Sequence, residues 1–409
     1  MKVLLACVVA GSAIAGTASA QISAGRMLLE SRLRYETVEQ AGLSRTADGL
    51  SDRTRIGWET GETKGLRGLI EFETVEPLIT GHFNVVIPTR SLNGKAQYPA
   101  INDPANSELN RLQMTWKVNP ALTVVVGRQL MNVDDQRFVG TTAWRQDEQT
   151  FDAIKADLVR GKFSATYIYL ARVNRNLDQD WTSDSHALIL GYTFSAPLRI
   201  ETFDYALDFR NTPILSTDTA GARASGRFKF DGAQISYAVT YAHQGDYRSN
   251  NGQFSLGYEG VSVDAVYGLW SGGLAYEVLG GDGKRGFVTP LQTNHGLQGW
   301  ADAFSAVGGA KTFVDGLEDL NLQIVVRPKW HVGAFGNPQF TLRGHNFDNH
   351  RFGVFLAREL DAEASFALTP RLSLTSQFAD FQASAHRPQS AAAPPASRTK
   401  FSVGLEFKL

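Results

Sequence analysis

Apolar and polar residues alternate along most of the chain with a period of two. Within residues 26–37, charged residues such as Glu30 and Arg32 share one face, while Leu33 and Tyr35 share the other. Successive side chains of a β-strand point to opposite sides of its sheet, so this alternation predicts strands. It recurs in residues 53–60, 66–74, 111–117 and 223–230. No helical period of 3.6 is sustained between these segments.

The same pattern predicts eighteen strands, most of them long enough to cross a hydrocarbon layer when tilted, which takes about 9–11 residues. They lie near residues 25–38, 52–62, 65–75, 108–118, 121–131, 148–159, 162–173, 185–195, 197–208, 220–230, 233–243, 251–259, 261–270, 319–328, 338–347, 359–369, 372–383 and 400–409.

The connections between these strands alternate in length. Those after even-numbered strands are short, with residues 329–337 as the exception, and those after odd-numbered strands are long, above all residues 76–107 and 271–318. Short periplasmic turns opposite long external loops are typical of outer-membrane barrels. A soluble β-sandwich also alternates but has no reason to separate loops by length. We therefore expect an all-β fold, a transmembrane antiparallel β-barrel with both termini in the periplasm.

The first twenty residues read as a signal peptide. Lys2 precedes an apolar run over residues 3–15, and Ala18, Ser19 and Ala20 form an A-x-A cleavage site. Cys7, the single cysteine, lies in this segment. The barrel is then expected to occupy residues 21–409, in the cell outer membrane.

Composition excludes several classes of protein. The 40 basic and 41 acidic residues leave a net charge of −1, which does not suit a nucleic-acid partner. Hydrophobic residues make up 43% and charged residues 20%, so the chain is not disordered. No zinc-binding motif is present, and the G-x-G-x-x-G match at residues 281–286 runs into Pro290, which cannot open the helix that a dinucleotide site needs. No metal or cofactor is expected.

The last strand carries its own signal. Phe401, Val403, Leu405 and Phe407 alternate with polar or small residues up to the final Leu409. Such a tail resembles the C-terminal assembly signal of outer-membrane proteins, although most of these end in Phe. Expected partners are therefore outer-membrane lipid and the barrel-assembly machinery.

Two further stretches are more specific than the general pattern. Gly127-Arg128-Gln129 is followed by a polar segment containing Trp144-Arg145-Gln146 and by Phe151-Asp152; farther along, Leu279-Gly280-Gly281-Asp282 precedes Gly299-Trp300-Ala301-Asp302. With the terminal strand, these segments resemble the alginate export family of outer-membrane barrels. The resemblance implies a monomeric eighteen-stranded barrel whose arginine-rich pore passes an anionic solute. It does not name the solute, and an alginate-like polyuronate, an oligosaccharide acid or a small carboxylate would all fit.

Candidate pore-lining residues follow from the family-like segment and from the polar faces of the strands. Arginine suits carboxylate solutes because its planar fork binds them through two hydrogen bonds. The loop over residues 132–147 is expected to be able to fold inward, and Arg137 within it to be a solvated surface charge. An alternative is that the wall arginines only pair with nearby glutamates, which stabilises a sheet. The candidates are Arg128, Arg145, Asp152, Arg32, Arg34, Arg53, Arg55, Arg67, Arg327 and Arg343.

These observations predict a passive channel for anions, with no catalytic residue, because rings of Arg or Lys favour anions in a pore. Two alternatives remain. One is an outer-membrane hydrolase with a Ser–His pairing on the barrel wall, for which His243, His295 and His345 are the histidines to test. The other is a structural barrel whose lumen is plugged by residues 271–318.

Overall fold

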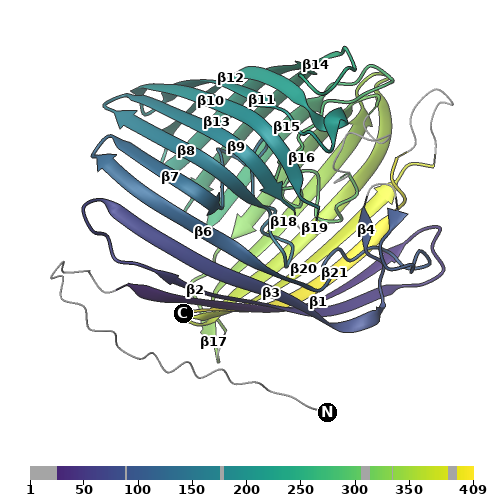
Figure 1. The fold of residues 1–409 in the computed structure, drawn as a ribbon. Coiled ribbons are helices and arrows are strands. Elements are labelled where there is room, and N and C mark those ends of the chain that lie inside the picture. Colours follow the sequence, from purple (N-terminus) through teal and green to yellow (C-terminus); the bar gives the residue numbers. More distant parts are fainter. Residues whose placement is uncertain (1–24, 88–89, 176–178, 305–313, 334, 386–393) are drawn as a thin grey trace.

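The chain forms a closed antiparallel β-barrel of eighteen strands (Figure 1), as predicted. The computed structural model describes residues 25–87, 90–175, 179–304, 314–333, 335–385 and 394–409, so the predicted signal peptide lies outside the described residues. No helix within those ranges is long and apolar enough to cross a membrane. The barrel strands are β1 (Arg26–Gln40), β2 (Ala47–Glu59), β3 (Leu66–His82), β6 (Asn106–Asn119), β7 (Leu122–Gln129), β8 (Thr150–Arg160), β9 (Phe163–Asn174), β10 (Trp181–Ser195), β11 (Leu198–Leu207), β12 (Thr217–Phe230), β13 (Ala233–Asp246), β14 (Ser255–Tyr267), β15 (Trp270–Leu279), β16 (Leu317–Val326), β18 (Phe335–Asn349), β19 (Val354–Thr369), β20 (Leu372–Ala383) and β21 (Arg398–Lys408).

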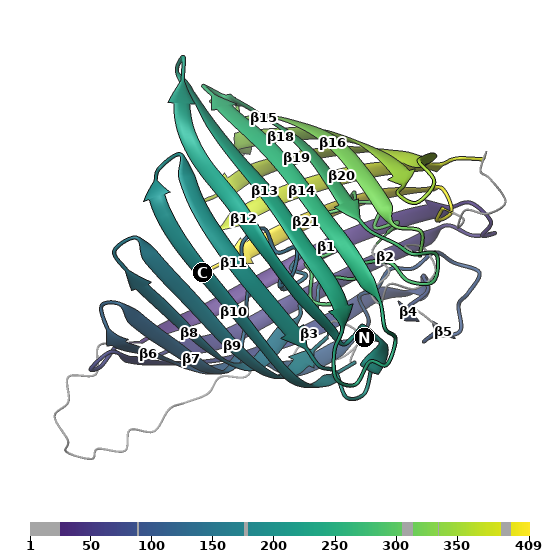
Figure 2. The ribbon, with the colours of Figure 1, turned by 90° about the horizontal axis from the view of Figure 1, so that it is seen from above.

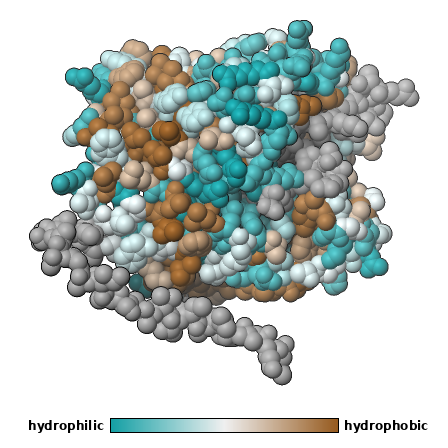
Figure 3. Space-filling model, in the orientation of Figure 1, coloured by the Kyte–Doolittle hydropathy of each residue, from teal (hydrophilic) through white to brown (hydrophobic). Residues whose placement is uncertain are grey.

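The sheet closes because the first and last strands pair. β1 pairs with β21 from Glu30 opposite Lys408 to Gln40 opposite Arg398, and Figure 2 shows the two strands side by side. Closure leaves no strand edge with unpaired backbone groups, which a hydrocarbon environment could not satisfy. The outward faces carry exposed apolar side chains, such as Trp58 and Phe401, and Figure 3 shows such residues gathered in patches on the surface.

Two of the expected strands differ from those observed. Residues 251–259 and 261–270 were expected to be separate strands joined at Gly260, but β14 runs continuously through Gly260. The turn lies farther on, at Gly268, whose φ of +60° suits glycine, and β15 then occupies part of the expected loop 271–318. Gly260 is a glycine for another reason: a Cβ there would lie 2.8 Å from the hydroxyl of Tyr258. Gly260 inside β14 therefore indicates close packing against Tyr258 rather than a turn.

Tight turns alternate with longer loops, as expected. Six connections have two residues, whereas the loops over residues 83–105, 130–149 and 280–316 are long. The first of these loops contains the two-residue strands β4 (Val86–Ile87) and β5 (Arg90–Ser91), and the exceptional short-side connection contains β17 (His331–Val332). The one 3₁₀ helix among the described residues is η1 (Pro213–Leu215).

The hydrophobic core lies inside the barrel. Inward side chains of β8–β13, among them Phe151, Ile168 and Phe203, are buried against apolar residues of the long loops, such as Val139 and Leu291. The lumen of a porin is ordinarily polar and water-filled, and this part of the inner wall departs from that pattern. The opposite half, on β1–β3, carries buried charges instead. Two long loops therefore fold into the lumen and have an apolar wall on one side and a charged wall on the other.

A constriction built from two inward loops

The first inner loop, residues 130–149, is fixed to the charged wall by arginine side chains. Arg32 on β1 donates to the Gln146 side chain at 2.8 Å and to the Ala143 carbonyl at 3.0 Å. Gln146 in turn donates to the hydroxyl of Ser51 at 2.9 Å. Because a loop that leaves regular structure has unpaired carbonyls, guanidinium donors from the wall can hold it inside the barrel.

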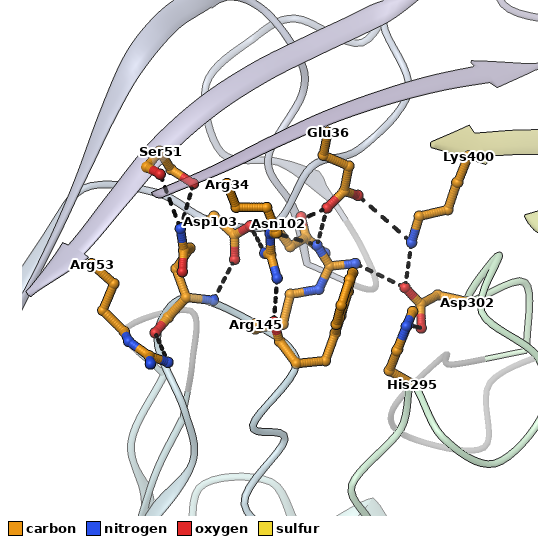
Figure 4. Close-up of polar contacts among 12 residues, drawn as sticks. Arg34, Glu36, Ser51, Arg53, Asn102, Asp103, Arg145, His295, Asp302 and Lys400 are labelled. Atoms are coloured by element: carbon orange, nitrogen blue, oxygen red, sulfur yellow. Dashed lines mark hydrogen bonds and ion pairs between the residues drawn. The ribbon is translucent and has the colours of Figure 1, made fainter. Parts of the chain in front are cut away.

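A buried ion-pair network lies beside this anchor (Figure 4). Arg34 on β1 contacts Asp103, a residue of the loop over 83–105, and its guanidinium lies 4.6 Å from the ring centre of Trp144. The Arg145 guanidinium lies 3.5 Å from Glu36 and 3.7 Å from Asp103. Burial alone would raise the pKa of Asp103, but the positive charges of Arg34 and Arg145 outweigh burial and lower it to about 2. The Asp103 carboxylate therefore stays ionised as part of the network.

The second inner loop, residues 280–304, joins the same network through Asp302. The Asp302 carboxylate lies 2.9 Å from Arg145, 2.6 Å from Lys400 on β21 and 3.0 Å from His295 (Figure 4). Burial raises the pKa of this carboxyl, yet Lys400, His295 and Arg145 together hold it well below its ordinary value. Burial lowers the pKa of His295, which favours its neutral form. One carboxylate thus links the two loops and the closing strand.

Arg137 is the anchor on the far side of the first inner loop. It is 1% exposed and donates to Glu277 on β15 at 2.7 Å and to Gln292 of the second inner loop at 2.6 Å. The expectation of a solvated surface charge was wrong for this residue. The negative charge of Glu277 outweighs the effect of burial and raises the pKa of the Arg137 guanidinium.

Aromatic packing completes the contact between the two loops and the wall. The rings of Trp144 and His295 stack with centroids 4.1 Å apart and planes within 5°. Phe138 packs against Phe203 and Tyr205 of β11, with centroid separations of 5.1 and 5.3 Å. The loops are therefore packed parts of the barrel interior, and they form a constriction rather than an external cover.

Open space remains in the lumen next to this constriction. One cavity of about 280 Å³ is lined by residues of β12–β18, including Tyr258 and Glu277, and a second of about 460 Å³ is lined by β10–β14. The second cavity has three arginines, Arg199, Arg223 and Arg227, against one carboxylate, Asp264. We call these three arginines the basic ladder.

The members of the basic ladder differ in their pairing. Arg199 lies 2.9 Å from Glu201, and Arg223 lies 2.5 Å from Asp135 of the first inner loop. Arg227, opposite Ser236 on the neighbouring strand, is exposed, and no carboxylate among the described residues pairs with it. Arg199 and Arg223 are therefore paired with carboxylates, and Arg227 is the member of the ladder that has no carboxylate partner in the described part of the chain.

The predicted pore-lining arginines of the strands have structural partners. Arg53 and Arg55 contact Glu30 and Glu73 respectively, and Arg67 lies 3.3 Å from Glu59. The alternative of pairing with wall glutamates therefore describes Arg53, Arg55 and Arg67. Arg32 and Arg34 hold the constriction in place.

Arg327 and Arg343 were the candidates on the later strands. Arg327 donates to Gln339 at 2.8 Å and Ser271 at 2.9 Å. Arg343 donates to Gln323 at 2.9 Å and to the Gly296 carbonyl of the second inner loop at 3.0 Å. Arg343 therefore anchors the second inner loop to the barrel wall, as Arg32 anchors the first.

Arg128 and Asp152 do not line the lumen. They pair with each other at 2.8 Å, but the register places Arg128 opposite Leu112, whose exposed side chain belongs to the apolar outer face. The neighbouring Gln129 is the buried, inward residue. The register thus contradicts the expected role of this pair. Because three consecutive valines precede Gly127, the sequence shows no alternation there from which the inward face could be identified.

The three histidines of the hydrolase alternative lie in different surroundings. His243 contacts the Ser255 hydroxyl at 2.7 Å on the outer face of β13 and β14. His345 is buried against Asp319 at 2.9 Å, and His295 belongs to the constriction. Only His243 has a serine partner among the hydrogen bonds of the described residues.

Carboxylates that could hold a cation gather where the first inner loop returns to the wall. Glu73, Glu108 and Asp147 each offer an oxygen, and these oxygens lie within 4.8 Å of one another. Burial and the negative charges of Glu73 and Glu108 raise the pKa of Asp147 well above its ordinary value.

Several functional residues escaped sequence reasoning. Asp302 lies in the family-like segment, and Arg223 and Arg227 lie in a clear alternating run, so the sequence contained a signal for all three. His295 was a candidate only as a hydrolase histidine. Asp103 gave no signal, because it lies in a long loop whose partner Arg34 is 69 residues away.

Comparison with known proteins agrees with this fold. Residues 112–262 match the model of the alginate export family. No curated protein sequence matches the chain. Among solved structures, Pseudomonas aeruginosa OpdK with vanillate has a TM-score of 0.68 at 12% identity and covers 95% of this chain and 99% of its own.

Two other solved structures are similar. Pseudomonas aeruginosa OccK9 (OpdG) has a TM-score of 0.69 at 14% identity and covers 95% of this chain and 99% of its own. Acinetobacter baumannii OccAB1 has a TM-score of 0.65 at 11% identity and covers 95% of this chain and 98% of its own. The match to the alginate export family model thus covers residues 112–262, and the solved structures share the barrel fold over nearly the whole chain.

Proposed function

We propose that this barrel is a passive outer-membrane channel for small anionic solutes of the carboxylate class. The observation that carries the proposal is the basic ladder, which places three arginines and one carboxylate around a cavity of about 460 Å³. Fixed positive charge on a lumen wall raises the local concentration of anions and favours their passage. Because Arg227 has no carboxylate partner among the described residues, its guanidinium is available to a solute.

The constriction supports a small solute rather than a polymer. Ion pairs and aromatic stacking join the two inner loops to each other and to the wall, so a polyuronate chain would require them to separate. A monocarboxylate would need only the space beside the loops. One of the similar solved structures is OpdK with vanillate, a small carboxylate of this kind, which supports the proposal.

Solute flux into proteoliposomes tests the proposal. Benzoate should enter faster than benzamide, which has the same size and no charge, and Arg227→Gln should reduce this preference. Arg358→Gln is the matched control, because Arg358 lies on the outward face of β19 beside the exposed Leu360. Equal entry of the two solutes, or an equal effect of both substitutions, would contradict the proposal.

A second candidate, a barrel closed by its own loops, is favoured by the apolar packing of both inner loops against the inner wall of the barrel. It predicts no flux of either solute in the wild-type protein, with flux appearing only when the loops are released. The same proteoliposomes distinguish the two candidates.

The proposed channel also has a route to the membrane, an orientation and an oligomeric state. We infer export through the signal peptide at residues 1–20, assembly directed by the C-terminal strand, periplasmic termini, and a monomeric channel that needs no cofactor and catalyses no reaction.

A further inference from the structure

Three carboxylates meet where the first inner loop rejoins the barrel wall. Glu73 on β3 and Glu108 on β6 are direct partners across neighbouring strands, and Asp147 approaches them from the loop. One oxygen of each lies within 4.8 Å of the other two. The cluster therefore spans two wall strands and the loop that forms the constriction.

Two of these carboxylates are buried with one oxygen unpartnered. Glu73 is 3% exposed and Asp147 is 1% exposed. Arg55 contacts one oxygen of Glu73, and Asn106 donates to one oxygen of Asp147 at 2.9 Å. Glu73 Oε1 and Asp147 Oδ1 have no hydrogen-bond donor within the described part of the chain. Buried acceptors are nearly always satisfied in folded proteins, so these two oxygens indicate a missing partner.

The local charge points to a cation as that partner. Glu148 adds a fourth carboxylate next to Asp147, and Arg55 meets both Glu148, at 2.8 Å, and Glu73. The guanidiniums of Arg53 and Arg55 both act on Glu73 and Glu148, and these two positive charges are fewer than the three carboxylates of Glu73, Asp147 and Glu148. Like charges held this close disfavour their own ionised forms unless a cation lies between them.

The donor set selects the kind of cation. All the ligand atoms are carboxylate oxygens, with no histidine or cysteine in the cluster. Oxygen-only sites suit hard divalent cations, and Ca²⁺ accepts irregular arrangements completed by water better than Mg²⁺ does. Zinc and copper would favour nitrogen or sulfur ligands.

We propose that Glu73, Glu108 and Asp147 bind a Ca²⁺ ion that fastens the first inner loop to β3 and β6. The loop carries Trp144 and Arg145, the residues that meet the second inner loop, so the ion also supports the constriction. The site does not depend on conduction: an ion can bind here whether the barrel passes anions or is closed.

Calorimetric titration of the full chain in detergent, after treatment with a chelator, tests the site with CaCl₂ alone. The wild type should bind one Ca²⁺ per chain. Asp147→Asn and Glu108→Gln should each weaken binding by at least about tenfold, since affinity follows the number of charged ligands. The control is Glu62→Gln, which removes an exposed carboxylate in the connection between β2 and β3 that pairs with Lys117 at 2.7 Å; its binding should match that of the wild type.

Hydrogen exchange of the wild type provides a second readout that needs no variant. Added Ca²⁺ should slow amide exchange in residues 141–149 and leave the strands β12–β14 unchanged. The proposal is overturned if folded wild-type protein shows no saturable Ca²⁺ binding, if the two variants bind as tightly as the wild type, or if exchange in the loop does not respond. Should Asp147→Asn fail to fold, Glu108→Gln and the exchange measurement decide.

Discussion

The guanidinium of Arg145 lies 2.9 Å from the carboxylate of Asp302, and this ion pair joins two loops whose residues are 157 positions apart. Lys400 on the closing strand meets the same carboxylate at 2.6 Å. The position of the constriction thus depends on one buried anion that three separate parts of the chain share. Removing that anion is the sharpest perturbation that the structure offers.

Asp302→Asn should destabilise the protein and loosen the constriction. The substitution removes the nearest counter-charge of Arg145 and Lys400 and leaves Glu36, at 3.5 and 3.6 Å, as the carboxylate that both still share. Breaking a buried pair on one side costs about 3–5 kcal/mol. We expect a lower unfolding midpoint in detergent and a larger, noisier single-channel conductance. Asp180→Asn is the control, because its pair with Arg172 is about half exposed and contributes little. Equal effects of the two substitutions would contradict this role for Asp302.

The contribution of Asp103 should depend on pH in a defined window. Its pKa is about 2 in the folded protein and near 3.8 ordinarily, so its stabilising effect is complete above pH 4 and disappears as the pH falls towards 2. The difference in unfolding midpoint between the wild type and Asp103→Asn should therefore be constant from pH 7 to about 4 and narrow below that. A difference that already narrows between pH 7 and 5 would assign the effect to another group.

Anion selectivity should rise as the pH is lowered. Partial burial and the nearby negative charge of Glu201 raise the pKa of Asp134 to about 6, and Arg223, Asp135 and Arg199 act on the same carboxyl. Above pH 6 the Asp134 carboxylate adds negative charge beside the basic ladder; below it that charge is lost. The anion permeability of the wild type should increase from pH 7 to pH 5, while Asp134→Asn should show the low-pH value at both. A pH-independent wild type would contradict the assignment.

Arg128→Ala should leave selectivity unchanged. Arg128 lies opposite Leu112 on the outer face, so its charge is separated from the lumen by the sheet. The reversal potential of the variant in a salt gradient should equal that of the wild type, in contrast to Arg227→Gln. A shift as large as that of Arg227→Gln would mean that β7 has the opposite phase.

Gly127→Ala should impair folding of the barrel. Gly127 has a φ of +114°, and an added Cβ would collide with the carbonyl of Leu112 on the neighbouring strand. Such a backbone conformation costs a residue other than glycine about 1–3 kcal/mol, before the collision is counted. Gly257→Ala on β14 is the matched control, because no atom lies within 4 Å of its Cβ position. Gel-shift assays of refolding yield should separate the two; similar yields would refute the strain at Gly127.

The sequence could predict the barrel because the alternation is dense and consistent. In β1 and β2, charged residues at every second position fixed both the strand and its inward face, as the burial of Arg34 and Arg53 confirms. The alternation failed where residue type did not change from one position to the next, as at the three valines before Gly127. It also failed at Gly260, which leaves room for Tyr258 instead of making a turn.

The constriction was only partly predictable. That residues 132–147 could fold inward was anticipated, and apolar residues such as Phe138 and Val139 inside a loop are the physical reason. The sequence could not predict the partners of the loop residues. Arg137 and Glu277, for example, are 140 positions apart, and each resembles a solvated charge when viewed alone. Pairing across the lumen is a property of the closed barrel rather than of any local segment.

The reversal potential of the reconstituted wild-type protein in a KCl gradient tests the central claim most directly. If the basic ladder governs passage, the potential should lie towards the chloride equilibrium value, and Arg227→Gln should move it towards zero. A potential on the potassium side would contradict the account, and so would a bilayer that shows no current at any voltage.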